Sequence, residues 1–118
     1  MFCVNDFEDI LPLTPATFHI LLALSNEDRH GYAIMQEVAE LTDGRLRLGP
    51  GTLYGAIKKL LADGLIEEAD ERPDPRLDDS RRRYYRLTKH GARAARGEAL
   101  RLEQLVKLAR RKKLLSSA

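Results

Sequence analysis

Proline and glycine constrain this chain strongly, because they divide its first half into short segments. Thr14-Pro15 has the form of a helix start, since threonine can cap a helix and proline suits its first position. Gly44 and Gly64 stand where the end of a helix needs a left-handed residue. The sequence Gly49-Pro50-Gly51-Thr52 opens a further helix. The pattern therefore predicts three short helices, at residues 14–24, 30–41 and 53–63.

Apolar residues recur at helical spacing within these segments. The first segment is apolar nearly all round, so we expect it at the centre of the domain. The inner stripes of the other two segments are Ile34, Val38 and Leu41, then Leu53, Ile57, Leu60 and Leu61.

Short strands complete the predicted fold. Residues 45–48 alternate charged and apolar side chains and predict a short strand, and residues 65–69 and 83–87 predict two more. The polar segment between the last two is longer than a tight hairpin turn, so we expect it to project into solvent. Thr88 caps a last helix that ends near Leu115. The fold class is mainly α with a small β-hairpin: a winged helix-turn-helix with an appended C-terminal dimerisation helix.

The length and composition limit what else the chain can be. Its 118 residues suit one domain, with a tail at 1–10, a winged helix-turn-helix at 11–88 and a basic-ended helix at 89–118. No apolar run approaches the roughly 20 residues of a membrane span, and the acidic N-terminus differs from a basic secretory signal. We therefore expect a cytoplasmic protein that does not bind membranes. Cys3 is the only cysteine, which excludes an internal disulfide and a cysteine-based zinc site.

The sequence contains no constellation typical of an enzyme. The histidines, His19, His30 and His90, are too scattered to suggest a ligand set or a catalytic group. Phosphate-binding and dinucleotide-binding fingerprints are absent. A domain of this size also has little room for a deep active site. We therefore expect no catalytic residue, no metal site and no cofactor.

Charge is distributed unevenly along the chain, although its net value is only +2. Up to Gly44 there is one arginine against eight acidic residues, and from Arg45 onward there are 19 basic residues against 10 acidic ones. Such a basic second half favours a polyanionic partner.

The third helix has the features of a recognition helix. In a helix-turn-helix the second helix of the motif enters the major groove, and its N-terminal residues reach the bases. Exposed amides there suit a phosphate, and the lysines that follow supply charge to the backbone. Alternatively, Gly-Pro-Gly is only a turn and Tyr54 only packs against the wing. The predicted contacts of this helix, about residues 50–63, are Pro50, Gly51, Thr52, Tyr54, Lys58 and Lys59.

The hairpin, residues 70–84, is predicted to be a basic wing. Arg81, Arg82 and Arg83, with Arg76 before them, can contact the backbone or enter the minor groove. The alternative is a solvated face, since the neighbouring Asp74, Asp78 and Asp79 could neutralise the arginines.

The last helix carries an apolar stripe with little core left to cover. A second copy of the chain is the simplest partner, and a two-fold dimer would bind a pseudo-palindromic double-stranded operator. The alternative is that the helix folds back on its own domain. The predicted dimer residues are Ala92, Ala95, Ala99, Leu102, Leu105, Val106 and Ala109.

The chain resembles the PadR-type transcriptional regulators. The matching motifs run from about residue 11 to residue 91: Leu11-Pro12-Leu13-Thr14-Pro15, His30-Gly31-Tyr32-Ala33-Ile34, Leu48-Gly49-Pro50-Gly51-Thr52-Leu53-Tyr54, Leu60 to Ile66 and Arg82-Arg83-Tyr84-Tyr85-Arg86-Leu87-Thr88-Lys89-His90-Gly91. The resemblance implies a winged-helix dimer, usually a repressor, with Gly51, Thr52 and Tyr54 in the recognition helix and the tyrosine near the phosphate backbone. The chain departs from the family at Gly55, where many relatives have proline. It also lacks the tryptophan on which some relatives stack aromatic ligands.

Two other functions fit the same fold. Winged helices also serve as adaptors that bind proteins without nucleic acid, and a MarR-like regulator would carry more helix at both ends. We expect a repressor relieved by a small-molecule effector, a partner or another signal.

Overall fold

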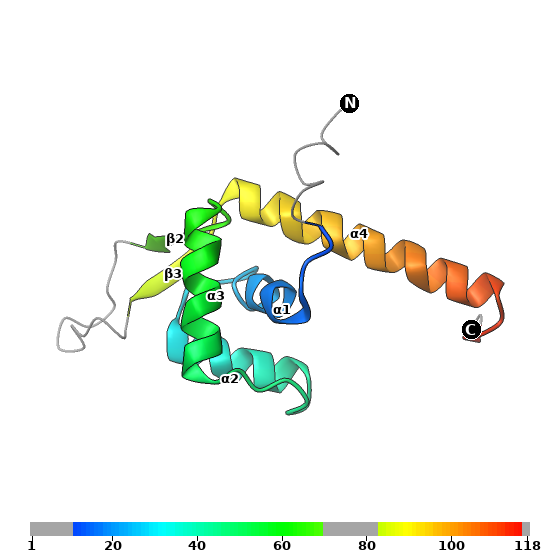
Figure 1. Cartoon of the computed structure of the whole chain (residues 1–118), viewed down its shortest axis with the longest axis horizontal. Helices are drawn as coiled ribbons and strands as arrows, with labels where there is room; N and C mark the ends of the chain where they lie inside the picture. The colour runs from blue at the N-terminus through cyan, green and yellow to red at the C-terminus, as the bar shows by residue number, and fades with distance from the viewer. Residues whose placement is uncertain (1–10, 70–82, 117–118) are drawn as a thin grey trace.

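The computed structural model describes residues 11–69 and 83–116 (Figure 1). The elements in chain order are α1 (Pro15–Ala23), β1 (Arg29–His30), α2 (Gly31–Leu41), α3 (Pro50–Ala62), β2 (Ile66–Ala69), β3 (Tyr84–Leu87) and α4 (Lys89–Arg111). Helices α1, α2 and α3 form a compact group on one side of α4, and the described parts of β2 and β3 lead away from that group. This is the predicted mainly helical fold with a small antiparallel sheet.

The helix starts lie close to the predicted positions because local chemistry sets them, whereas the last helix ends at Arg111 and not near Leu115, with Lys113 at a φ of +66°. The Thr14 hydroxyl accepts a hydrogen bond from the Thr17 amide at 3.1 Å, and the Thr88 hydroxyl accepts one from the Gly91 amide at 2.9 Å. Each bond satisfies an amide that has no partner inside its helix. Gly44 has a φ of +78° after α2, in the left-handed region that glycine adopts without strain.

The sheet has three strands in the order β1-β3-β2, with both pairings antiparallel. Ile66 pairs with Leu87 and Ala69 with Tyr84, while Arg29 on the other side of β3 pairs with Tyr85. The predicted hairpin strands are confirmed.

The predicted strand at residues 45–48 is wrong: the segment is irregular, and the third strand is β1 instead. Its charged and apolar residues alternate because Leu48 is buried and Leu46 packs against the core, while Arg45 and Arg47 are exposed. The alternation therefore reports which side chains point inward, and not a backbone partner.

The core lies where α1, α2 and α3 meet. Ile20 and Leu21 of α1, Ile34 and Val38 of α2, and Leu53 of α3 are fully buried. The apolar stripes predicted for α2 and α3 supply most of the inward side chains, except that Leu41 is exposed and Leu61 only partly buried. The core fixes α3 by one face and leaves its other face exposed.

The first half of α4 packs on the domain and its second half extends beyond it. Gly91, Ala94 and Glu98 are buried, and α4 contacts α1 and β3. The second half of α4 runs away from α1, as Figure 1 shows. No helix in the described part of the chain is both long enough and apolar enough to cross a membrane.

Candidate nucleic-acid interface

The N-terminal end of α3 is open to solvent. Gly49, Pro50, Gly51 and Thr52 are all exposed. Gly49 is the N-cap residue and offers no side chain to cap the helix, while Pro50 has no amide hydrogen. The first amides of a helix lack partners within the helix and carry the positive end of its dipole. The amides at this end can therefore donate hydrogen bonds to an anionic oxygen, and no side chain has to move aside for it.

Tyr54, one turn into α3, is held against α2. A Cβ atom placed on Gly31 would collide with its ring, with Cζ only 2.9 Å away. Gly31 is buried, and Tyr54 is partly buried and packs against the core. The ring thus rests on the start of α2. The glycine of the His-Gly-Tyr motif is the sequence signal for this contact, because a Cβ at this position would force the ring to move.

The two lysines of α3 have different surroundings. The Lys59 ammonium lies 3.2 Å from the Asp63 carboxylate, an ion pair one turn apart on the helix surface. Lys58 is exposed and makes no ion pair with any other described residue. Lys58 is therefore the lysine of α3 whose charge is available to an external anion.

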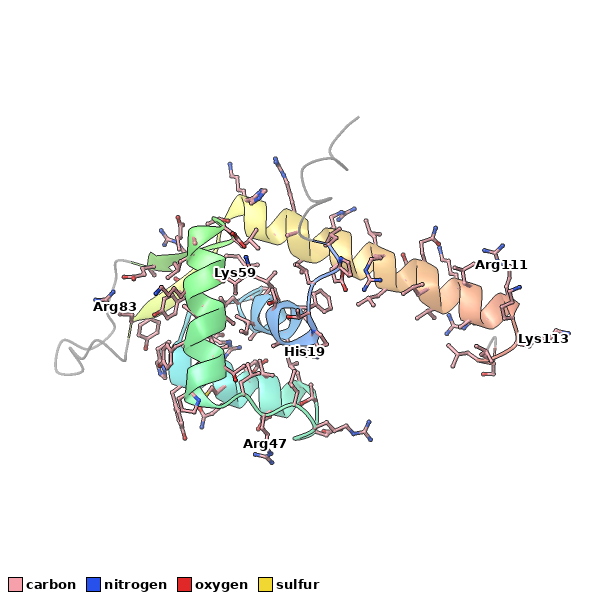
Figure 2. All side chains as sticks on the ribbon, in the orientation of Figure 1. His19, Arg47, Lys59, Arg83, Arg111 and Lys113 are labelled. Carbon is pink, nitrogen blue, oxygen red and sulfur yellow. The ribbon has the colours of Figure 1, made fainter. Side chains whose placement is uncertain are left out.

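The described part of the wing carries paired charges. Arg83 lies 3.0 Å from Glu68, and Arg86 lies 2.8 Å from Glu67, across the β2–β3 ladder. Arg83 is at the outer end of β3 (Figure 2). The other predicted wing contacts, Arg81 and Arg82, lie outside the described residues, as does Arg76. An arginine paired with a surface glutamate contributes little net charge to the surface. Its charge becomes available only when a phosphate replaces the glutamate as its partner.

The residues predicted to form a dimer interface divide into two groups along α4. Ala95 is partly buried and packs against the core of its own domain, and Leu102 is also partly buried. Farther along, Leu105 is 49% exposed and Val106 is 38% exposed. The remaining members of the predicted set, Ala92, Ala99 and Ala109, are at least partly exposed. The helix therefore covers its own domain with the start of the stripe and leaves the rest uncovered.

Glu98 is a residue that sequence reasoning missed. Its side chain is buried on α4, where it accepts a hydrogen bond from the Leu13 amide at 3.2 Å. Arg101 also donates two bonds to it, at 2.9 and 2.7 Å. The bond from Arg101 is the main cause that lowers the pKa of this carboxyl below its ordinary value of 4.5. A glutamate within a basic helix gives no sequence signal for this role, because its partner amide is far away along the chain.

Comparison with known proteins identifies the family. The sequence model of the Transcriptional regulator PadR-like family matches residues 20–97, from α1 into α4. The transcriptional regulator Rv3488 of Mycobacterium tuberculosis is 35% identical over 89 residues, which cover 75% of this chain and 77% of that protein. The chain belongs to the PadR-like family of transcriptional regulators. The expectation of a regulator, and not an enzyme, agrees with membership of this family.

Other relatives differ in length and in how closely they match. An uncharacterized 37.1 kDa protein in transposon TN4556 of Streptomyces fradiae is 34% identical over 86 residues, and the match spans only 22% of that protein. RosR of H. salinarum has 27% identity and a TM-score of 0.60, covering 93% of this chain and 84% of that one. A structure of Bacillus subtilis PadR in complex with operator DNA has 22% identity and a TM-score of 0.60 and covers 73% and 47% of the two chains. These structures share the fold of the PadR-like chain.

Proposed function

We propose that this PadR-like regulator is a dimeric repressor that binds a pseudo-palindromic double-stranded operator through α3. The observation that carries the proposal is the exposed N-terminal end of α3, whose first amides have no side-chain cap. Lys58 lies on the exposed face of the same helix. The solved complex of B. subtilis PadR with operator DNA supports it, since the two chains share a fold.

The residues of α3 divide the work of binding. Amides at Gly51 and Thr52 offer hydrogen bonds to a phosphate or a base edge, and the Thr52 hydroxyl adds a further donor. The Tyr54 hydroxyl, fixed by the packing of its ring on Gly31, donates to the phosphate backbone. Lys58 supplies charge, and Lys59 does so when Asp63 releases it. Phosphate contacts set the register, and the donors at the helix start read the sequence.

The wing contributes to binding through arginines. Arg83 exchanges Glu68 for a phosphate when DNA arrives, and Arg81 and Arg82 contact the backbone or the minor groove. An exchange of one carboxylate for one phosphate costs little at an exposed site, because neither ion loses its hydration fully.

A second copy of the chain would cover the exposed apolar face of α4. Leu105, Val106 and Leu108 are each at least 38% exposed in the protomer. Their burial against the same residues of a partner would join two recognition helices about one turn of DNA apart, which roughly corresponds to 34 Å. Repression then follows from occupancy of a promoter by the bound dimer.

Selection from a pool of random duplexes identifies the operator and tests the proposed function in one experiment. We expect enrichment of an inverted repeat, which is then used as a labelled probe in fluorescence anisotropy. Lys58→Ala should weaken binding and reduce the slope of log K against log salt by about one, because one phosphate contact is lost. Tyr54→Phe keeps the packing of the ring and tests the hydroxyl alone.

The matched control is Lys112→Ala, which removes an exposed lysine beyond the C-terminal end of α4. It should leave the affinity for the selected duplex unchanged. Absence of any enriched sequence, or unchanged binding by both α3 variants, would overturn the proposal and favour a protein-binding adaptor.

A further inference from the structure

The outer face of α4 carries a row of basic side chains that the proposed function does not use. Lys89, Arg93, Arg96, Lys107 and Arg111 are all exposed. Successive members are three, four or eleven residues apart, and eleven residues are close to three turns of an α-helix. They therefore lie within a narrow sector of the helix surface, which we call the α4 basic face. Figure 2 shows nitrogen-tipped side chains along the edge of α4 that points away from the other helices.

The charges of the α4 basic face are not neutralised within the described structure. None of its five members forms an ion pair with a described residue. Of the acidic residues of α4, Glu98 is buried and bonded to Arg101, which leaves Glu103 as the exposed one. On α3, by contrast, Lys59 is paired with Asp63. The described surface therefore has more unpaired positive charge on α4 than on the recognition helix.

The α4 basic face lies at the far end of α3 from the proposed operator contacts. Helix α4 begins beside the C-terminal end of α3, where the Thr88 hydroxyl donates to the Gly64 carbonyl at 2.6 Å. The uncapped amides are at the opposite end, and a helix of 13 residues is roughly 20 Å long. A duplex held by the start of α3 thus leaves the α4 basic face free.

We propose that the α4 basic face binds the phosphate backbone of a second DNA duplex without reading its sequence. From Lys89 to Arg111 the helix spans roughly 33 Å, about one turn of B-form DNA. Lysine and arginine displace condensed counterions from such a backbone, which is the source of sequence-independent affinity. A dimer bound to its operator through α3 then bridges two DNA segments.

Duplex DNA fits this face better than a membrane surface does. A helix that lies on a membrane inserts apolar side chains next to its charges. Here Leu100, 50% exposed, is the large apolar residue of this side, whereas the apolar stripe of α4 lies on the other side. A face with five basic side chains and one large apolar side chain is typical of a surface that contacts phosphates and does not insert into lipid.

A bridging assay tests the inference. Beads that carry the selected operator duplex are loaded with protein, and capture of a free fluorescent duplex of unrelated sequence is measured. The wild-type protein should capture the second duplex at low salt. The variant R93A/R96A/K107A/R111A should capture at least about tenfold less, because four phosphate contacts are lost. Its operator affinity should change less than about twofold, and its circular dichroism should be unchanged, since all four side chains are exposed.

Glu103→Gln is the matched control on the same face. It removes the exposed acidic charge and should increase capture of the second duplex, a direction that a structural role does not predict. Capture that is unaffected in the quadruple variant would overturn the inference. Parallel loss of operator affinity would also overturn it, because the face would then contact the operator itself. Binding of the wild-type protein to vesicles of anionic lipid without capture of DNA would identify a membrane surface instead.

The inference does not depend on sequence reading by α3. If the α3 variants bind the selected duplex normally, the proposed function fails. Sequence-independent binding can still be measured by anisotropy with an unrelated duplex. The quadruple variant should lose that binding, and Lys58→Ala should largely retain it. Equal loss in both variants would contradict a DNA-binding surface on α4 that is separate from α3.

Discussion

Two buried glycines set the distances between helices at the scale of single residues. A Cβ on Gly91 would collide with the Leu65 carbonyl, so the start of α4 can approach the end of α3 only because residue 91 lacks a side chain. Gly31 plays the same part for the ring of Tyr54. Both glycines belong to motifs that the sequence revealed, and the structure supplies the physical reason for each.

Gly91→Ala should therefore destabilise the protein. Its methyl group meets backbone atoms that cannot rotate away, and overpacking of this kind typically costs about 1–3 kcal/mol of unfolding free energy. Gly55→Ala is the matched control, since nothing lies within 4 Å of a Cβ at that exposed position of α3. It should stabilise the helix by up to about 1 kcal/mol. Thermal unfolding followed by circular dichroism measures both; a Gly91→Ala variant as stable as Gly55→Ala would contradict the contact.

The link between α4 and the segment before α1 belongs to the scale of elements. Leu13 and Arg101 both bond to Glu98, so one buried carboxylate joins the chain before α1 to the middle of α4. This link couples the orientation of α4 to the segment that precedes α1. The position of anything bound to the far half of α4 therefore depends on it. Burial of the carboxylate is tolerated because three hydrogen bonds satisfy it.

The lowered pKa of Glu98 makes stability depend on pH in the acidic range. A carboxyl with a lower pKa when folded stabilises the protein fully above its ordinary value of 4.5. That contribution declines as the pH falls through the lowered pKa. Glu98→Gln should reduce the unfolding free energy at neutral pH by about 1.5–3 kcal/mol, the usual range for hydrogen bonds to a charged group. Urea unfolding of both proteins from pH 7 to pH 3 measures the difference.

The difference between wild type and Glu98→Gln should shrink toward acid, because protonation removes the same charge from the wild-type side chain. Glu103→Gln serves as a control, since Glu103 is exposed and forms no ion pair with a described residue. A constant difference across this pH range would show that the carboxylate charge contributes nothing.

The apolar face of α4 decides the behaviour of the whole molecule. Its first part completes the core of the protomer, and its second part, with Leu105 and Leu108, has no cover within the described residues. An exposed stripe of this kind on a basic helix is typical of an interface between copies. The hydrogen bonds of Glu98 would connect that interface to the segment before α1.

Leu105→Glu should convert the proposed dimer into monomers, because a charge at a buried interface has no partner there. Leu105 is 49% exposed in the protomer, so the change should leave the protomer fold intact. Leu100→Glu is the control: Leu100 is 50% exposed, and its position five residues earlier places it well away from the stripe. Sedimentation velocity measures the mass of each. A dimer that persists in Leu105→Glu would place the interface elsewhere.

The sequence by itself determined the helices and the family. Helix starts at Thr14 and Thr88 and the turn at Gly44 depend on residues close together in the chain, so local chemistry is enough to locate them. The exposed start of α3 follows from the same signals. Motifs around Gly31, Tyr54 and Tyr85 then identified the PadR-like family.

Only the tertiary structure decided which segments meet. The pairing of Arg29 with Tyr85, the contact of Leu13 with Glu98 and the packing of Ala95 on its own domain all join residues distant in sequence. Alternation at residues 45–48 predicted a strand, whereas in the structure β1 pairs with β3 and residues 45–48 form a loop with two inward leucines. A pattern of side chains records burial, whereas a strand also needs a partner backbone, which the surrounding fold must supply.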